Sequence, residues 1–284
     1  MPDARCLMPG TLFNTTNMIR KPVVAGQFYT ANAARLEKEI KSYLEPEAKK
    51  IDAIGCVSPH AGYMYSGPVA GSVLSHIKPK NCYIILGPNH TGKGDRFGMG
   101  MDKNWMTPLG EVEIDNELAQ AILDNSKLIK KDDACHMYEH SIEVQLPILQ
   151  VLNRNFSFVP IVISQGTASE YIRIGEDIAE AIQKTKRNLT IIASSDMTHY
   201  ESQLSAKKKD MLAIERIKAL DIEGLIDTIE KYDISMCGYA PTAAMMSSAI
   251  KLGAKNTELI KYQTSGDTSG DYSSVVGYAG IIIY

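Results

Sequence analysis

The alternation of short apolar runs with helical segments limits most strongly what this chain can fold into. The strand-like runs are AIGCVS (53–58), CYIIL (82–86), FSFVPIVI (156–163) and LTIIASS (189–195). Short runs rich in β-branched residues are typical of strands buried on both faces of a sheet. Helical patterns lie between them, at 67–77, 115–125, 140–152 and 168–185. This order predicts an α/β fold with a mixed, largely parallel sheet covered by helices.

The last third of the chain continues the same pattern. It predicts helices near 203–219, 221–231 and 238–252, followed by the strands ELIKYQTS and SSVVGYAGIII. No internal repeat and no linker rich in Pro, Gly or Ser divides the sequence, so we expect one domain over residues 18–284. Residues 1–17 have no periodicity and precede a second methionine, Met18, and we interpret them as an unstructured or extraneous extension.

Composition excludes several classes of function. The formal net charge of −3 provides no basic field for nucleic acid. The longest apolar stretches fall well short of the ~20 residues that a membrane-spanning helix needs. The five cysteines are scattered without a disulfide framework, and no signal peptide is evident, which favours the cytoplasm. We therefore expect a cytoplasmic protein whose partner is a small molecule or a peptide.

Three strand-like runs deliver titratable side chains just where they end. IGCVSPH ends at His60, YIILGPNH at His90, and TIIASSDMTH carries Asp196 and His199. In open α/β sheets, ligands bind beyond the carboxyl ends of the strands, where the loops converge. One histidine after a strand is usually a hydrogen-bonded loop residue, but three of the six histidines share this position. The pattern predicts that these side chains meet in one site.

A divalent metal ion suits two imidazoles that approach each other, since neutral imidazole nitrogen binds Zn, Cu, Fe or Ni. Cys237, in SMCGYAP, is a candidate third ligand because the start of a helix lowers the pKa of a nearby thiol from ~8.5. The alternative is that Cys237 is a buried core thiol. His76, inside a helical pattern, is interpreted as a packing or surface residue.

The segment HMYEH, residues 136–140, fits the H-x-x-E-H pattern of inverted zinc peptidases. That chemistry needs both histidines on one continuous helix, whereas KKDDAC before the segment has no helix signal and Pro147 follows it. We therefore interpret Glu139 and His140 as residues that orient ligands or line the pocket. Phe28 and Tyr65 are further candidates for the pocket wall.

The motifs also carry a resemblance to a known family. VAGQFY, PHAGYMYSG, ILGPNH, EHSIEVQLP, SSDMTH, CGYAP and SSVVGYAG occur in this order. Together they resemble the Memo family, also called AmmeMemoRadiSam system protein B, over nearly everything from Met18 onward. That family is similar in fold to the catalytic subunit of class III extradiol dioxygenases, which use non-haem Fe(II).

The resemblance implies His60, His90 and Cys237 as metal ligands, with Asp196 and His199 in the same pocket. Phe28 stands where relatives have tryptophan. In the dioxygenases the third ligand is a carboxylate, and a thiolate in its place favours softer metals and is itself open to oxidation. Fe(II) is the expected ion, with Cu or Zn as alternatives. The resemblance also implies a radical-SAM protein as a partner.

Three functions are compatible with these residues. The first is a metal-dependent oxidoreductase of dioxygenase type, in which His199, held by Asp196, accepts or returns a proton near pH 7. The second is a metal-dependent hydrolase that uses the same site. The third is a binding module without turnover that recognises a peptide or a protein.

Overall fold

The runs richest in β-branched residues form the centre of the sheet. The structure is a computed structural model that describes residues 18–284 of the chain. Its central strands are β2 (Gly55–Ser58), β3 (Cys82–Gly87), β8 (Ser157–Ile163) and β9 (Thr190–Ser194). They run parallel in the order β8-β3-β9-β2, and nearly all their residues are buried. The predicted parallel sheet is confirmed.

Further strands, parallel and antiparallel, extend both edges of this centre. Beside β2 lies β12 (Val275–Ile283), which pairs with β11 (Thr257–Thr264) and with β10 (His199–Glu201). Beyond β8 lie β6 (Gly110–Ile114), β5 (Lys103–Thr107) and β1 (Met18–Arg20). The short strands β4 (Phe97–Met99) and β7 (Lys130–Lys131) branch from β8. The sheet is therefore mixed, as predicted.

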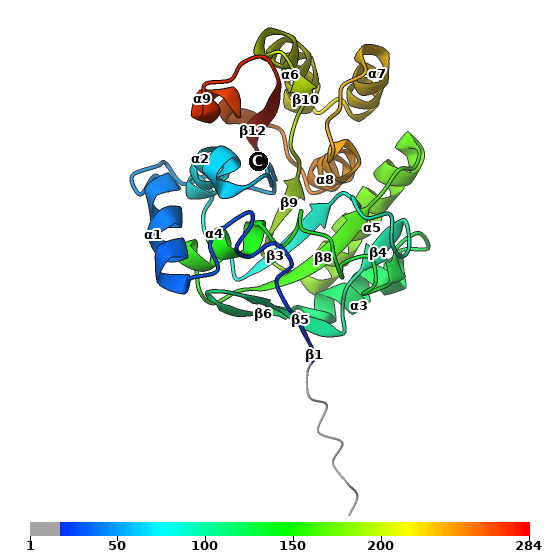
Figure 1. The fold of residues 1–284 in the computed structure, drawn as a ribbon. Coiled ribbons are helices and arrows are strands. Elements are labelled where there is room, and N and C mark those ends of the chain that lie inside the picture. The colour runs from blue at the N-terminus through cyan, green and yellow to red at the C-terminus, as the bar shows by residue number, and fades with distance from the viewer. Residues whose placement is uncertain (1–17) are drawn as a thin grey trace, which may run out of the picture.

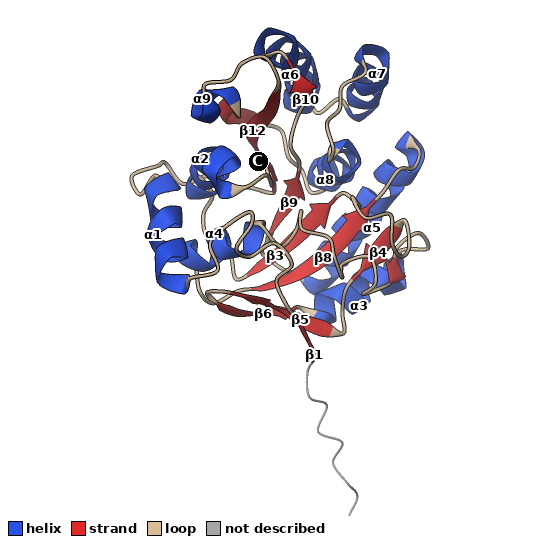
Figure 2. Cartoon of the chain, viewed as in Figure 1, coloured by secondary structure: helices blue, strands red, loops and turns tan. Residues whose placement is uncertain are grey.

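Helices cover both faces of the sheet (Figures 1 and 2). One face carries α1 (Ala33–Tyr43), α2 (Tyr63–Ser75) and α4 (Gln145–Leu152). The other carries α3 (Asn116–Asn125), α5 (Ala168–Thr185), α6 (Gln203–Lys218), α7 (Ile222–Tyr232) and α8 (Tyr239–Lys251). The short α9 (Gly266–Ser269) precedes β12. Because strand side chains alternate, Ile84 and Leu86 enter one core while Tyr83 and Ile85 enter the other.

The helices differ from the predicted ones mainly at their ends. Helix α2 begins at Tyr63 rather than at 67, and α4 begins at Gln145 rather than at 140. Pro147 lies in the first turn of α4, where a missing N–H costs no hydrogen bond, so the helix continues through it. Asp115 caps α3 through the Leu118 N–H.

Several elements were not predicted. Helix α1 has only Leu36 and Ile40 buried, so its apolar pattern is thin. Strands β5 and β6 are short and half-exposed, and β1 is three residues long. The predicted extension, residues 1–17, lies outside the described residues. No helix among the described residues is both long and apolar enough to cross a membrane.

A buried carboxylate fixes the segment that follows β9. Asp210, on α6, accepts hydrogen bonds from the Thr198 N–H (2.9 Å) and the Tyr262 hydroxyl (2.8 Å). Its Oδ2 lies only 1.9 Å from where a Cβ on Gly277 would stand. The glycine in SSVVGYAG therefore makes room for Asp210, which in turn places the loop that carries Asp196 and His199.

The variant Gly277→Ala should lose about 2–4 kcal/mol of unfolding free energy, because the new methyl group displaces the Asp210 carboxylate. Gly62→Ala is the matched control, since a Cβ there would meet its neighbours at ordinary contact distances of 3.5 Å and more. It should cost less than about 1 kcal/mol, the range for a change at a helix N-cap. Urea denaturation of both variants measures the difference. Equal losses would contradict this role of Gly277.

Candidate metal centre

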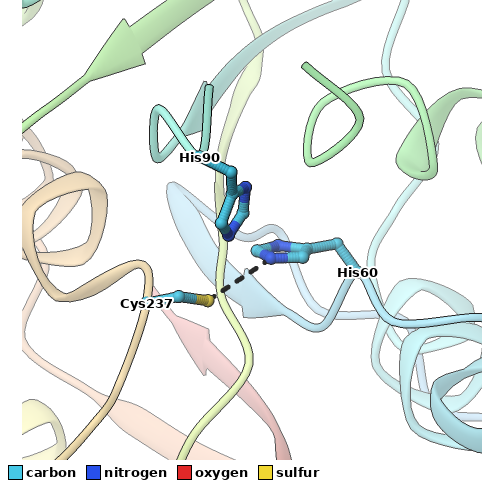
Figure 3. A group of neighbouring side chains, drawn as sticks. All are labelled: His60, His90 and Cys237. Carbon is cyan, nitrogen blue, oxygen red and sulfur yellow. Dashed lines mark hydrogen bonds between the residues drawn. The ribbon is translucent and has the colours of Figure 1, made fainter. Parts of the chain in front are cut away.

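The loops after β2 and β3 bring two histidines to one point. Strand β2 ends at Ser58 and leads through Pro59 to His60, and β3 ends at Gly87 and leads to His90. The two imidazole rings lie 5.2 Å apart between centroids. Cys237 approaches from the loop before α8, and the potential ligand atoms of the three residues all lie within 4.8 Å of one another. Figure 3 shows the three side chains pointing toward a common centre.

The hydrogen bonds around His60 fix which of its nitrogens carries the proton. His60 Nδ1 lies 3.0 Å from Ser194 Oγ, and that hydroxyl donates its single proton to the Ser141 carbonyl at 2.6 Å. Gln145 Nε2 also donates to Ser194 Oγ (2.8 Å). Ser194 can therefore only accept from His60, so the proton is on Nδ1. This leaves the Nε2 lone pair free, 3.3 Å from Cys237 Sγ.

A buried carboxylate orients His90 in the same way. Glu139 is fully buried and accepts from the His90 N–H (2.6 Å) and from His90 Nδ1 (2.9 Å). The backbone N–H groups of His140 and Ser141 also donate to it, each at 2.9 Å. Burial opposes its charge, but these donors outweigh burial and lower the pKa of Glu139 to about 2. Glu139 is thus an ionised acceptor that leaves His90 Nε2 without a proton when the ring is neutral.

Cys237 is held against the loop after β9. Its sulfur accepts from the Asp196 N–H at 3.3 Å. A Cβ on Gly238 would collide with the Ser194 carbonyl and with Ser195 Cβ, both at 2.4 Å, so the glycine of CGYAP allows this close approach. The expected lowering of the thiol pKa is wrong for the protein without metal, because burial and the Asp196 charge raise the pKa of Cys237.

Asp196 and His199 lie beside this group but do not bond each other as we predicted. Asp196 is buried, and its Oδ1 accepts from the His60 N–H at 2.8 Å. Burial raises the pKa of Asp196 to about 6. His199 Nδ1 instead donates to the Ser235 carbonyl at 2.9 Å, while Ser235 Oγ accepts from the His199 N–H. The backbone of Ser235 therefore orients His199.

His140 belongs to a second group of potential ligands. His90, Glu139 and His140 also offer ligand atoms within 4.8 Å of one another. The His140 ring stacks on the His90 ring, with 4.8 Å between their centroids. The Phe28 ring packs edge-on against His140, with 4.7 Å between the two centroids. Phe28 thus contacts His140, a member of this second group. Tyr65 is half-buried on α2, and its carbonyl accepts from Gln263.

A cavity of about 550 Å³ opens on one side of the histidine–cysteine group. Its wall contains His90 and Cys237 and includes none of the residues that we predicted for the pocket, which are Phe28, Tyr65, Glu139 and His140. Three loops form it, at 88–96, 163–165 and 234–240. No carboxylate lines it, and Arg96, which does, is paired with the Glu170 carboxylate at 2.9 Å. A cationic ligand therefore finds no carboxylate in this wall, and an anionic ligand would compete with Glu170 for Arg96.

The inverted zinc-peptidase motif is not supported by the fold. Residues 136–140 contain no α-helix, so the two histidines of HMYEH do not share a helix face. His136 is buried against Trp105, with 5.4 Å between the ring centroids. His140 instead lies beside His60, with 5.6 Å between their ring centroids.

Sequence reasoning missed the buried residues that orient the histidines. Ser194 and Gln145 stand inside the motifs SSDMTH and EHSIEVQLP, but serine and glutamine are common throughout proteins and carry no distinctive spacing. The periodicity of the chain could have suggested them, since Ser194 ends an apolar strand and Gln145 begins a helix that is apolar except for its two glutamines, Gln145 and Gln150. A polar residue at such a position needs a buried partner.

Comparison with known proteins gives consistent matches. A family described as Memo-like protein matches residues 20–282. A MEMO1 family protein of Methanopyrus kandleri is 45% identical, over 93% of this chain and 99% of that protein. A MEMO1 family protein of Methanosarcina acetivorans is 42% identical over the same shares. A crystal structure of an uncharacterized protein from Escherichia coli K12 covers 80% of this chain and 98% of its own, with 11% identity and a TM-score of 0.49.

Ser194→Ala should weaken metal binding about tenfold, because His60 Nδ1 loses the acceptor that fixes its proton. Ser248→Ala is the matched control, since Ser248 is equally buried on α8 and donates to the Gly175 carbonyl. Each variant should lose about 1–3 kcal/mol of unfolding free energy. Only Ser194→Ala should change the zinc dissociation constant, measured by competition with a chelator. The same dissociation constant in both variants would contradict the orienting role.

Proposed function

The chain belongs to the Memo family, and we propose that it is a metal-dependent oxidoreductase that acts on a small molecule. One observation carries the proposal. In the neutral rings of His60 and His90, the surrounding hydrogen bonds leave one nitrogen each without a proton, and these nitrogens and the Cys237 sulfur come within 4.8 Å of one another. Apart from the hydrogen bond between Cys237 Sγ and His60 Nε2 (3.3 Å), the three groups gain little from their proximity unless an ion lies between them.

The chemistry of the donors fits a divalent metal ion. His60, His90 and Cys237 would hold it, with Ser194 and Glu139 as hydrogen-bond partners of the two rings, the usual arrangement behind metal-binding histidines. Three protein ligands leave coordination positions open, which is typical of reactive rather than purely structural sites. Fe(II) is our first choice for the ion, and copper is favoured next by the soft sulfur. Such an ion supplies one-electron chemistry toward oxygen and an organic substrate.

The chain's own residues would bind the substrate and move protons. The 550 Å³ cavity beside His90 and Cys237 is large enough for a small metabolite. Its wall lacks carboxylates and includes Arg96, whose guanidinium would turn from Glu170 to bind an anionic group of the substrate. His199 donates from Nδ1 to Ser235, so its Nε2 is free to accept a proton. We propose His199 for this role, with Asp196 shaping the local charge.

Location and partners are part of the same proposal. A reducing cytoplasm would keep Cys237 as a thiol, ready to bind the ion. The family resemblance suggests a radical-SAM protein as a partner, which would deliver or receive the small molecule.

His60→Ala should abolish stoichiometric metal binding and metal-dependent oxygen consumption, because it removes one of three ligands. His76→Ala is the control, since His76 caps α2 and its Nδ1 bonds the Ser72 carbonyl. Both variants are purified without oxygen and loaded with Fe(II). The ion is then counted by elemental analysis and oxygen uptake is followed with candidate anionic substrates.

The outcomes separate the three functions. Loss of metal and of oxygen uptake in His60→Ala alone supports the oxidoreductase. One equivalent of zinc with no oxygen dependence in the wild type would replace it by a hydrolase. A partner that binds His60→Ala as tightly as the wild type, with no turnover in either protein, would point to a binding module and contradict the proposal.

A further inference from the structure

We infer that Arg20, at the end of β1, is a positioning residue for the metal centre, which it reaches through Glu139 and His90. This inference rests on the proposed function for its metal readout, and on hydrogen bonds of the described residues for its geometry. Arg20 is buried, with 7% of its surface exposed, and is distant in sequence from every residue that it contacts below.

The Arg20 guanidinium holds one segment of the chain at three points. Nε donates to the His136 carbonyl at 2.8 Å, and Nη2 donates to the Glu139 carbonyl at 2.6 Å. Nη1 pairs with the Glu143 carboxylate at 2.7 Å. Residues 132–144, between β7 and α4, form neither helix nor strand. No regular ladder therefore fixes this segment, and its shape depends on such side-chain contacts.

The contact between Arg20 and the Glu139 carbonyl connects Arg20 to the metal centre through a single residue, Glu139. The carbonyl that Arg20 holds belongs to Glu139, whose carboxylate accepts from both the backbone N–H and the Nδ1 of His90. If the Glu139 backbone shifts, its carboxylate shifts with it. His90 would then lose the acceptor that sets its proton position and ring angle.

Through Glu143, Arg20 also fixes the position of the loop formed by residues 23–29. Glu143 accepts from the backbone N–H groups of Val23 and Val24 and from the Tyr29 hydroxyl at 2.7 Å. This connects the loop 23–29 to the same segment, and Phe28 in that loop packs on the ring of His140. The Arg20–Glu143 pair thus joins two loops that border the metal centre.

Stability alone is a poor explanation for this buried pair. Removing both charges from water costs about as much as their attraction returns, so buried ion pairs often add little net stability. A fixed geometry is what the pair provides. Arginine suits it because its planar fork reaches three acceptors at once, while its guanidinium also lies 3.9 Å over the Trp105 ring. Lysine has one compact donor group and cannot reproduce the three contacts.

Two variants and one control test the inference. Arg20→Met removes every donor, and Arg20→Lys keeps the charge with a single donor group. Lys80→Met is the matched control, because Lys80 is equally buried, at 6% exposed, and is bonded to Asp52 and Asn188. It precedes β3, whereas His90 follows the other end of that strand.

Two measurements are made on each protein. In the metal-free state, NMR of ¹⁵N-histidine-labelled protein follows the exchange of the His90 Nδ1–H with water. In the loaded state, chelator competition gives the Co(II) dissociation constant. We expect faster exchange and about tenfold weaker Co(II) binding in Arg20→Met, with a smaller change of both in Arg20→Lys. Lys80→Met should leave both unchanged, although it lowers unfolding free energy.

The inference is overturned if Arg20→Lys, or Arg20→Met where it folds, loses only unfolding free energy while exchange and Co(II) affinity stay at wild-type values. Equal changes in Lys80→Met would also overturn it, because they would reflect general loosening. A wild-type protein that binds no Co(II) would defeat the proposed function instead. The exchange of the His90 proton would then still decide the role of Arg20.

Discussion

The hydrogen bonds at the Nδ1 atoms of His60 and His90 are the interactions on which the rest of the site depends. An imidazole can present either nitrogen to an ion, and its second partner decides which one it presents. Ser194 and Glu139 accept hydrogen bonds from the Nδ1–H groups, so both Nε2 lone pairs of the neutral rings are available where Cys237 approaches. If either acceptor were lost, the same side chains in the same places would be weaker ligands.

These interactions need a fold that brings distant segments to one end of a sheet. Parallel strands β2, β3 and β9 end side by side, so the loops after them meet without long connections. Two of the motif glycines allow the close approaches that follow, Gly238 under the cysteine loop and Gly277 beside Asp210. The sequence motifs therefore contain glycines that permit close contacts and buried hydrogen-bond acceptors, in addition to the potential ligands.

The sequence predicted the central sheet and the convergence of His60 and His90, because both follow from general rules. Cys237 precedes a helix instead of following a strand, and it was the family resemblance that implied it as the third ligand. Buried parallel strands are continuous β-branched runs, and loops after such strands share one edge. It did not predict the cavity wall near Arg96, since three separate loops form it and no local pattern relates them. The prediction that Asp196 holds His199 was wrong. Adjacency in sequence suggested it, but the His199 ring is turned toward Ser235, which lies between α7 and α8.

The central claim is that one ion joins His60, His90 and Cys237. X-ray absorption at the zinc edge of the protein loaded with one equivalent of zinc tests it most directly, since it reports the atoms around the ion. We predict one sulfur at about 2.3 Å and two imidazole nitrogens at about 2.0–2.1 Å. A shell with no sulfur, or with a single imidazole, would contradict the claim.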